Sequence, residues 1–128
     1  DNKLFGISNQ TFHSEDWDLL NPEGFVYDFG YQSNAQSMDW SHVYGGNVFM
    51  ENPGNAYFID TYSKSYPTED RARIMEYAMG FYPESKCFGE EYLWKKLDYV
   101  CKDIRRNFDT TGWPSVTRWE RPLQQPLN

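Results

Sequence analysis

The chain has 128 residues, enough for one domain with its own hydrophobic core. Its 12 basic and 19 acidic residues leave a net charge of −7, which argues against binding to nucleic acid or to anionic lipid, because both attract clustered Lys and Arg. No apolar run approaches the length of a membrane span, so we expect no membrane insertion.

The N-terminal half is rich in turn signals. Residues 1–16 carry few signals of order, and the Asn-Pro-Glu-Gly run at 21–24 predicts a turn. The β-favouring residues of 25–31 predict a short strand after it. Residues 32–56 contain Gly-Gly and Asn-Pro-Gly but no helical period, which predicts a long loop of the kind that is often functional. Residues 56–62 favour a short extended piece.

Two amphipathic helices are predicted next, at 66–81 and 89–108. For the first, Ser65 is the expected N-cap and Pro67 suits the first turn. Its expected apolar face consists of Ala72, Ile74, Met75, Ala78, Met79 and Phe81. The apolar face of the second consists of Leu93, Leu97, Val100, Cys101, Ile104 and Phe108. Its charged residues are expected on the solvent side: Lys95, Lys96, Asp98, Lys102, Asp103, Arg105 and Arg106.

The fold class that follows is mainly α (α+β), with two principal helices, a small β element and long loops. The helices are expected to pack through Met75 and Met79 of one and Leu97 and Ile104 of the other. The tail after residue 108 holds two Trp and several Pro, so we expect an extended segment on the surface. Residues 1–128 form a single domain or a domain fragment.

The two cysteines, Cys87 and Cys101, belong to no CxxC motif, and their spacing fits no zinc knuckle. The sequence is compatible with a disulfide and with a pair of buried thiols, and it does not determine the redox compartment. We favour buried thiols, because Cys101 falls on the apolar side of the second helix.

The acidic pair Glu69-Asp70 lies at the start of the first helix. Its simplest interpretation is an ordinary helix start. Glu69 and Arg73 are spaced i,i+4 and could form an exposed pair worth about 0.3–0.5 kcal/mol. Asp70 would favour the positive end of the helix dipole.

The surrounding run "FIDTYSKSYPTEDRARIMEYAM" resembles the segment that follows the HExxH helix in bacterial zinc metallopeptidases of the gluzincin type, to which the catalytic domain of anthrax lethal factor is distantly similar. "DWDLLNPEGFVYDFGY" is similar to the turn and strand after that metal-binding helix. "YLWKKLDYVCKDIRRNFDTTGWPSVTRWE" is similar to the closing helix and tail. The resemblance touches much of residues 16–120 and implies the C-terminal half of a zincin-like domain.

The resemblance implies a role for two residues. Glu69 matches the third protein ligand to zinc, and Tyr62 matches a tyrosine that stabilises the oxyanion of the tetrahedral intermediate. The implied substrate is a peptide or protein. Asp70 and Ala72 match the rest of the acidic motif, whereas Arg73 stands where the family often has a Glu that orients a zinc-bound His.

The chain contains no HExxH motif, and its only histidines are His13 and His42. A catalytic zinc needs about three protein ligands and a general base. With one matched ligand, we expect this chain alone not to hold zinc tightly. We favour an HExxH helix upstream of the chain over a degenerate homologue. His13 in its polar loop is expected to be solvated rather than a ligand.

The alternative is a non-catalytic, aromatic-rich binding module. Ten Tyr, nine Phe and five Trp make up 19% of the chain, and loops such as "MDWSHVYGGNVF" could stack on sugar rings or grip a peptide. The burial of Glu69 discriminates the two hypotheses, because a ligand carboxylate should lie in a cleft beneath Tyr62.

Overall fold

A computed structural model describes residues 15–27, 48–49, 54–80 and 86–127 of the chain. The elements are α2 (Glu15–Asp18), η3 (Thr61–Lys64), α4 (Pro67–Met79), η4 (Lys86–Gly89), α5 (Glu91–Asn107) and η5 (Arg118–Gln124), where η marks a 3₁₀ helix. The mainly helical fold class is confirmed. Among the described residues, no helix combines the length and the apolar character that crossing a membrane requires.

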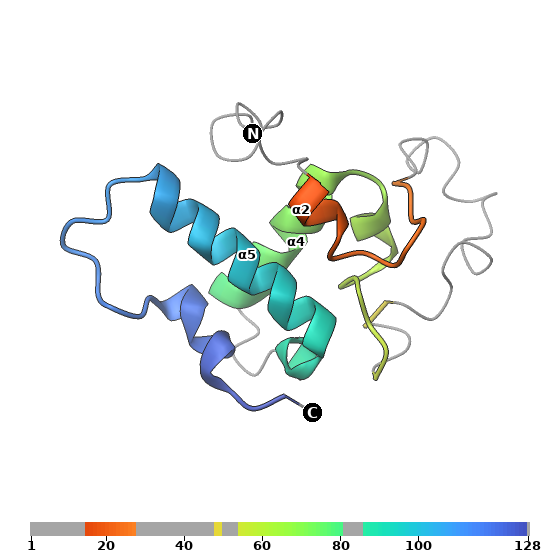
Figure 1. Ribbon diagram of the computed structural model, residues 1–128. Coiled ribbons are helices and arrows are strands. Elements are labelled where there is room, and N and C mark those ends of the chain that lie inside the picture. Colours follow the sequence, from red (N-terminus) through yellow and green to blue (C-terminus); the bar gives the residue numbers. More distant parts are fainter. Residues whose placement is uncertain (1–14, 28–47, 50–53, 81–85, 128) are drawn as a thin grey trace.

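The two principal helices, α4 and α5, cross, and the short α2 lies beside the N-terminal end of α4 (Figure 1). The small β element is reduced, in the described part of the chain, to one parallel bridge between Val48 and Phe58. Residues 25–27, expected as a strand, form none. Most of the expected loop 32–56 lies outside the described residues.

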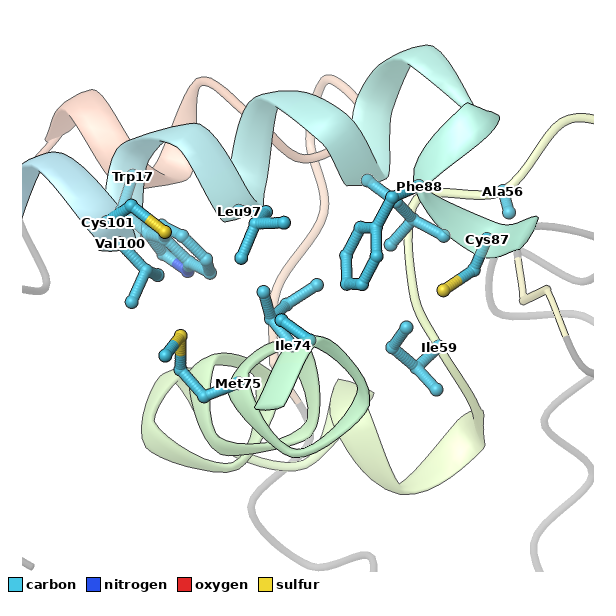
Figure 2. Packing of buried hydrophobic residues seen from close by; sticks show 12 residues of the cluster. Trp17, Ala56, Ile59, Ile74, Met75, Cys87, Phe88, Leu97, Val100 and Cys101 are labelled. Atoms are coloured by element: carbon cyan, nitrogen blue, oxygen red, sulfur yellow. The ribbon is translucent and has the colours of Figure 1, made fainter. Parts of the chain in front are cut away.

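The core lies between the facing sides of α4 and α5. Figure 2 shows Ile74 and Met75 of α4 pointing toward Leu97 and Val100 of α5. Further buried members are Cys101 of α5 and, from other parts of the chain, Trp17, Ala56, Ile59, Cys87 and Phe88. The periodicity of α5 therefore identified its buried face at Leu93, Leu97, Val100 and Cys101.

Both thiols are free and buried, as expected. Burial raises the pKa of the Cys87 thiol to about 12, and it does the same for Cys101.

Leu97→Ala is expected to destabilise the protein by about 2–5 kcal/mol, because the side chain is fully buried and its removal leaves a cavity. Urea unfolding of the variant and the parent measures the difference. Leu127→Ala, at a 49% exposed position, is the control and should change stability by less than about 0.5 kcal/mol. Coincident unfolding curves for Leu97→Ala and the parent would contradict the packing of α5.

The start of α4 differs from the prediction. The N-cap is Tyr66, which makes no side-chain capping bond, and Pro67 occupies the first turn as expected. Ser65 is not the cap, because its hydroxyl donates to the carbonyl of Tyr62 at 2.7 Å and closes η3. Asp60 caps η3 by accepting from the amide of Ser63 at 3.1 Å.

The tail is not extended, as was expected, but forms η5 with Pro122 inside it. A capping box between Thr117 and Glu120 starts this helix. Arg105 of α5 donates to both carboxylate oxygens of Glu120, at 2.6 and 2.7 Å, and this pair ties the tail to the helix.

Glu120 should make stability depend on pH. Its hydrogen bonds from Arg105 lower its folded pKa to about 2, against about 4.3 when unfolded. The contribution of Glu120 to the free energy of unfolding is therefore complete above the unfolded pKa, and it is lost as the pH falls from there toward about 2. Glu120→Gln should be less stable than the parent at about pH 6, and the difference should shrink by about pH 3.

Urea midpoints at both pH values test this prediction. Glu91→Gln, which changes an exposed glutamate of α5, is the control. An equal gap between Glu120→Gln and the parent at both pH values would show that Glu120 contributes no charge-dependent stability.

Candidate functional site

The two residues of the acidic pair at the start of α4 lie in different environments. Asp70 is fully buried, whereas Glu69 is half-buried. One oxygen of Asp70, Oδ2, accepts from the ammonium of Lys96 at 2.8 Å and from the hydroxyl of Tyr27 at 2.8 Å. Asp70 is therefore the centre of a buried polar network rather than a surface charge at the helix start.

Lys96 was expected on the solvent side of α5, and this prediction is wrong. Its side chain is fully buried, and its ammonium also donates to the carbonyl of Tyr57 at 2.7 Å and lies 3.9 Å from the ring centroid of Phe58. Burial pushes the pKa of Asp70 up and that of Lys96 down, and each charge opposes the shift of the other. Asp103, also expected outside, is buried as well.

The hydroxyl of Tyr27 joins the N-terminal segment to this ion pair. It accepts from the indole of Trp17 at 2.8 Å and from the amide of Asn21 at 3.0 Å, and it donates to Asp70. Burial and the charge of Asp70 raise the pKa of Tyr27 far above its usual range, so that the phenol stays protonated and acts as a donor. The Arg71 guanidinium lies 4.7 Å from the ring of Trp17 on the same side of the core.

This network ties two segments that are far apart in the sequence to the first turn of α4. They are residues 17–27 and the middle of α5. A buried charge that lost its partner would be costly, so the network holds the first turn of α4 in one position. Glu69 is the residue immediately before Asp70 and belongs to that turn.

Tyr62, the other predicted site residue, belongs to η3, directly before α4. The guanidinium of Arg73 lies 5.1 Å from its ring. Arg73 does not pair with Glu69, as the spacing suggested, but with Asp60 at 3.2 Å and Glu76 at 2.9 Å. Hydrogen bonding to Glu76 raises the pKa of Arg73, against the opposite effect of desolvation, so this cation is permanent.

The metal-ligand role of Glu69 and the oxyanion role of Tyr62 stay predictions. Within the described ranges, the carboxylate of Glu69 makes no ion pair or hydrogen bond, which leaves it available to a cation. The same ranges contain no group of three or more His, Cys, Asp and Glu that could hold a metal ion. His13, His42 and the aromatic loop before Val48 lie outside the described residues.

A groove of about 440 Å³ lies between α4, α5 and the tail. Its lining is apolar except for one glutamate: Ala72, Met75, Glu76, Met79, Ile104, Phe108, Trp113 and Trp119. Ala72 and Met79 were expected in the core but are exposed, Met79 to 45%. They fall on the edge of the apolar stripe, where the facing helix α5 does not cover them.

Comparison with protein-family models, with curated proteins and with solved structures finds no match. The resemblance to zinc metallopeptidases therefore rests on the three quoted stretches of sequence.

One signal in the sequence could have revealed the ion pair. Position 96 lies beside Leu93, Leu97 and Val100 on α5, so a lysine there is a candidate for a buried side chain. A buried ammonium is stabilised by an opposite charge, which a carboxylate supplies. The sequence alone does not single out Asp70, because many acids are available.

Proposed function

We propose that this chain is the C-terminal portion of a zinc-dependent metallopeptidase domain. In this proposal, Glu69 is the third protein ligand to zinc and Tyr62 stabilises the oxyanion. Upstream residues supply two histidine ligands and a glutamate base in an HExxH helix. The substrate is a peptide or protein.

The observation that supports this most is the buried network around Asp70. The three stretches that carry the resemblance each contribute to it: Trp17 and Tyr27 from the first, Asp70 from the second and Lys96 from the third. Three separate similarities in the sequence thus belong to one packed unit, and the residue next to its centre is Glu69. A metal ligand needs a backbone that is held in place by such surroundings.

The residues present fit a zinc site that is completed from outside the chain. Glu69 offers a half-buried carboxylate that has no partner among the described residues, and carboxylate oxygen is a suitable zinc ligand. Bound zinc would activate a water molecule and polarise the scissile carbonyl. Tyr62 offers a phenol that can donate to the developing oxyanion. The Arg73 guanidinium against the Tyr62 ring restricts the orientation of that phenol.

Glu69→Gln tests the proposal in a longer polypeptide that includes the HExxH helix. The helix should persist, because Gln is about as good a helix former as Glu. Zinc content, measured after gel filtration, should fall, and most peptide hydrolysis should be lost, since a neutral amide is a poorer ligand than a carboxylate.

Glu91→Gln is the matched control, because Glu91 occupies the first turn of the other principal helix. The 128-residue chain by itself should bind no zinc tightly in calorimetry. Full zinc content and full hydrolysis in the Glu69 variant would return the residue to the role of an ordinary helix start.

A further inference from the structure

We propose that a pocket between the segment 18–27 and the start of α4 binds a basic side chain of a peptide. The pocket has a volume of about 930 Å³, and its walls come from residues 18–19 and 21–27 together with Pro67. This binding site needs neither zinc nor an HExxH helix, so it stands apart from the proposed function. Two acids on its rim, one buried amide and an apolar wall carry the inference.

The backbone of this segment is fixed before a ligand arrives. The amide of Phe25 donates to the carbonyl of Pro22 at 2.9 Å and closes a turn. Gly24 within that turn has a φ of 82°, a left-handed conformation that glycine adopts without strain. Beyond the turn, the hydroxyl of Tyr27 donates to Asp70 of α4 at 2.8 Å. The walls are therefore preformed, and a ligand does not have to order them.

A buried acceptor in the pocket wall lacks a donor. Asn21 is 8% exposed, and its side-chain nitrogen donates to the hydroxyl of Tyr27 at 3.0 Å. Its side-chain oxygen, Oδ1, is screened from solvent and accepts no hydrogen bond within the described ranges. The two ends of this amide cannot be exchanged, because Tyr27 gives its only proton to Asp70. A buried acceptor without a donor is costly, so an N–H group that enters the pocket gains a hydrogen bond.

Two carboxylates on the rim supply the charge that attracts a cation. Asp18 and Glu23 both line the pocket and are exposed, and neither carboxylate forms an ion pair in the described part of the chain. Together with Oδ1 of Asn21, they offer acceptors to the N–H donors of an ammonium or a guanidinium group. The positive end of α4 lies close by at Pro67, but it carries only about half a charge, which the carboxylates outweigh.

The remaining wall suits the apolar stem of a lysine or an arginine. Leu19 is 80% exposed and Val26 is 73% exposed, and both line the pocket. Lys and Arg bury their methylene stems on such surfaces while the charged head meets polar groups. The volume lies within the range of about 300–1,000 Å³ that is usual for ligand pockets, so the backbone around the basic residue fits as well. The net charge of −7 also favours a basic partner.

Titration of the 128-residue chain with capped tripeptides tests the inference. Ala-Lys-Ala and Ala-Arg-Ala are the basic ligands, Ala-norleucine-Ala is the uncharged match, and n-butylammonium is the free amine. NMR follows the backbone amides of residues 18–27 and the side-chain amide of Asn21. It also follows the indole N–H of Trp17, which donates to the hydroxyl of Tyr27 at 2.8 Å.

The basic tripeptides should shift these signals, and the norleucine tripeptide should bind at least about tenfold more weakly, because it lacks the charged donor. Asp18→Asn combined with Glu23→Gln should weaken the binding of Ala-Lys-Ala by about three- to tenfold. Glu91→Gln combined with Asp98→Asn is the matched control. It removes the same charge from α5, where both acids pair with surface lysines, and should change the affinity by less than about twofold.

Three results would overturn the inference. Equal affinity for the lysine and norleucine tripeptides would show an apolar pocket that does not select a charge. Equal weakening by the two double variants would show attraction to the net charge of the chain alone. Binding of n-butylammonium as tight as that of Ala-Lys-Ala would show that the pocket takes a free amine and not a peptide. If the inference is correct, the tighter of the two basic tripeptides identifies the preferred head group.

Discussion

Replacing Asp70 by alanine should lower the free energy of unfolding by about 3–5 kcal/mol, because Lys96 then stays buried with an uncompensated charge. The two side chains are fully buried and their charged atoms lie 2.8 Å apart. Tyr27 loses its acceptor in the same change, since its hydroxyl donates to Asp70. Urea unfolding of the variant and the parent measures the loss.

The double variant Asp70→Ala with Lys96→Met separates the effect of the buried charge on stability from the effect of packing. Methionine fills much of the volume of lysine without a charge, so the double variant should recover a large part of the loss. Asp98→Ala is the control, because Asp98 pairs with Lys102 on the surface and should cost less than about 1 kcal/mol. A cost below about 1 kcal/mol for Asp70→Ala alone would mean that the buried pair does not hold α4 in place.

Tyr62→Phe in the longer polypeptide should lower kcat by about 10²–10³-fold, the usual effect of removing one oxyanion donor. Zinc content should stay unchanged, because the phenol is not proposed as a ligand. KM should change little, since the lost hydrogen bond forms only in the transition state. The Phe ring keeps the contact with Arg73, and urea unfolding of the variant and the parent checks that the fold is equally stable.

Tyr66→Phe is the matched control for this prediction. Tyr66 lies four positions further along, at the N-cap of α4, and makes no side-chain capping bond. Its variant should keep the kcat of the parent. An unchanged kcat in Tyr62→Phe would remove Tyr62 from the catalytic residues, even if Glu69 proved to be a zinc ligand.

Helical periodicity predicted the elements that dominate the fold. The boundaries expected for the two helices lie within two residues of α4 and α5, because Pro67 and the apolar repeat from Leu93 to Cys101 are strong local signals. The same repeat placed Cys101 inside correctly.

Predictions that depended on tertiary contacts failed. A lysine is normally assigned to the surface, and Lys96 is buried only because Asp70 and a carbonyl from another segment meet its ammonium. Ser65 was a reasonable cap by residue type, but Asp60 had already formed a 3₁₀ turn that uses the Ser65 hydroxyl. The tail became helical because Arg105 holds Glu120.

The candidate site follows from the sequence only through the resemblance. Nothing in the local pattern distinguishes Glu69 from other glutamates in a first helical turn, such as Glu91. The network that holds Glu69 in place joins side chains up to 79 positions apart, from Trp17 to Lys96, through Tyr27 and Asp70. Such a network forms only in the folded chain, so the residue types at single positions do not predict it.

The labelling rates of the two buried thiols report how often the core opens around each of them. With a pKa of about 12, each is almost entirely protonated near neutral pH and also lies out of reach of an alkylating reagent, so reaction waits for a transient opening. Cys101 lies in the middle of α5 and should react only when that helix leaves the core, whereas Cys87 lies in the short η4. If Cys87 reacts faster than Cys101, the η4 end opens as a separate cooperative unit; equal rates mean that the core opens as a whole.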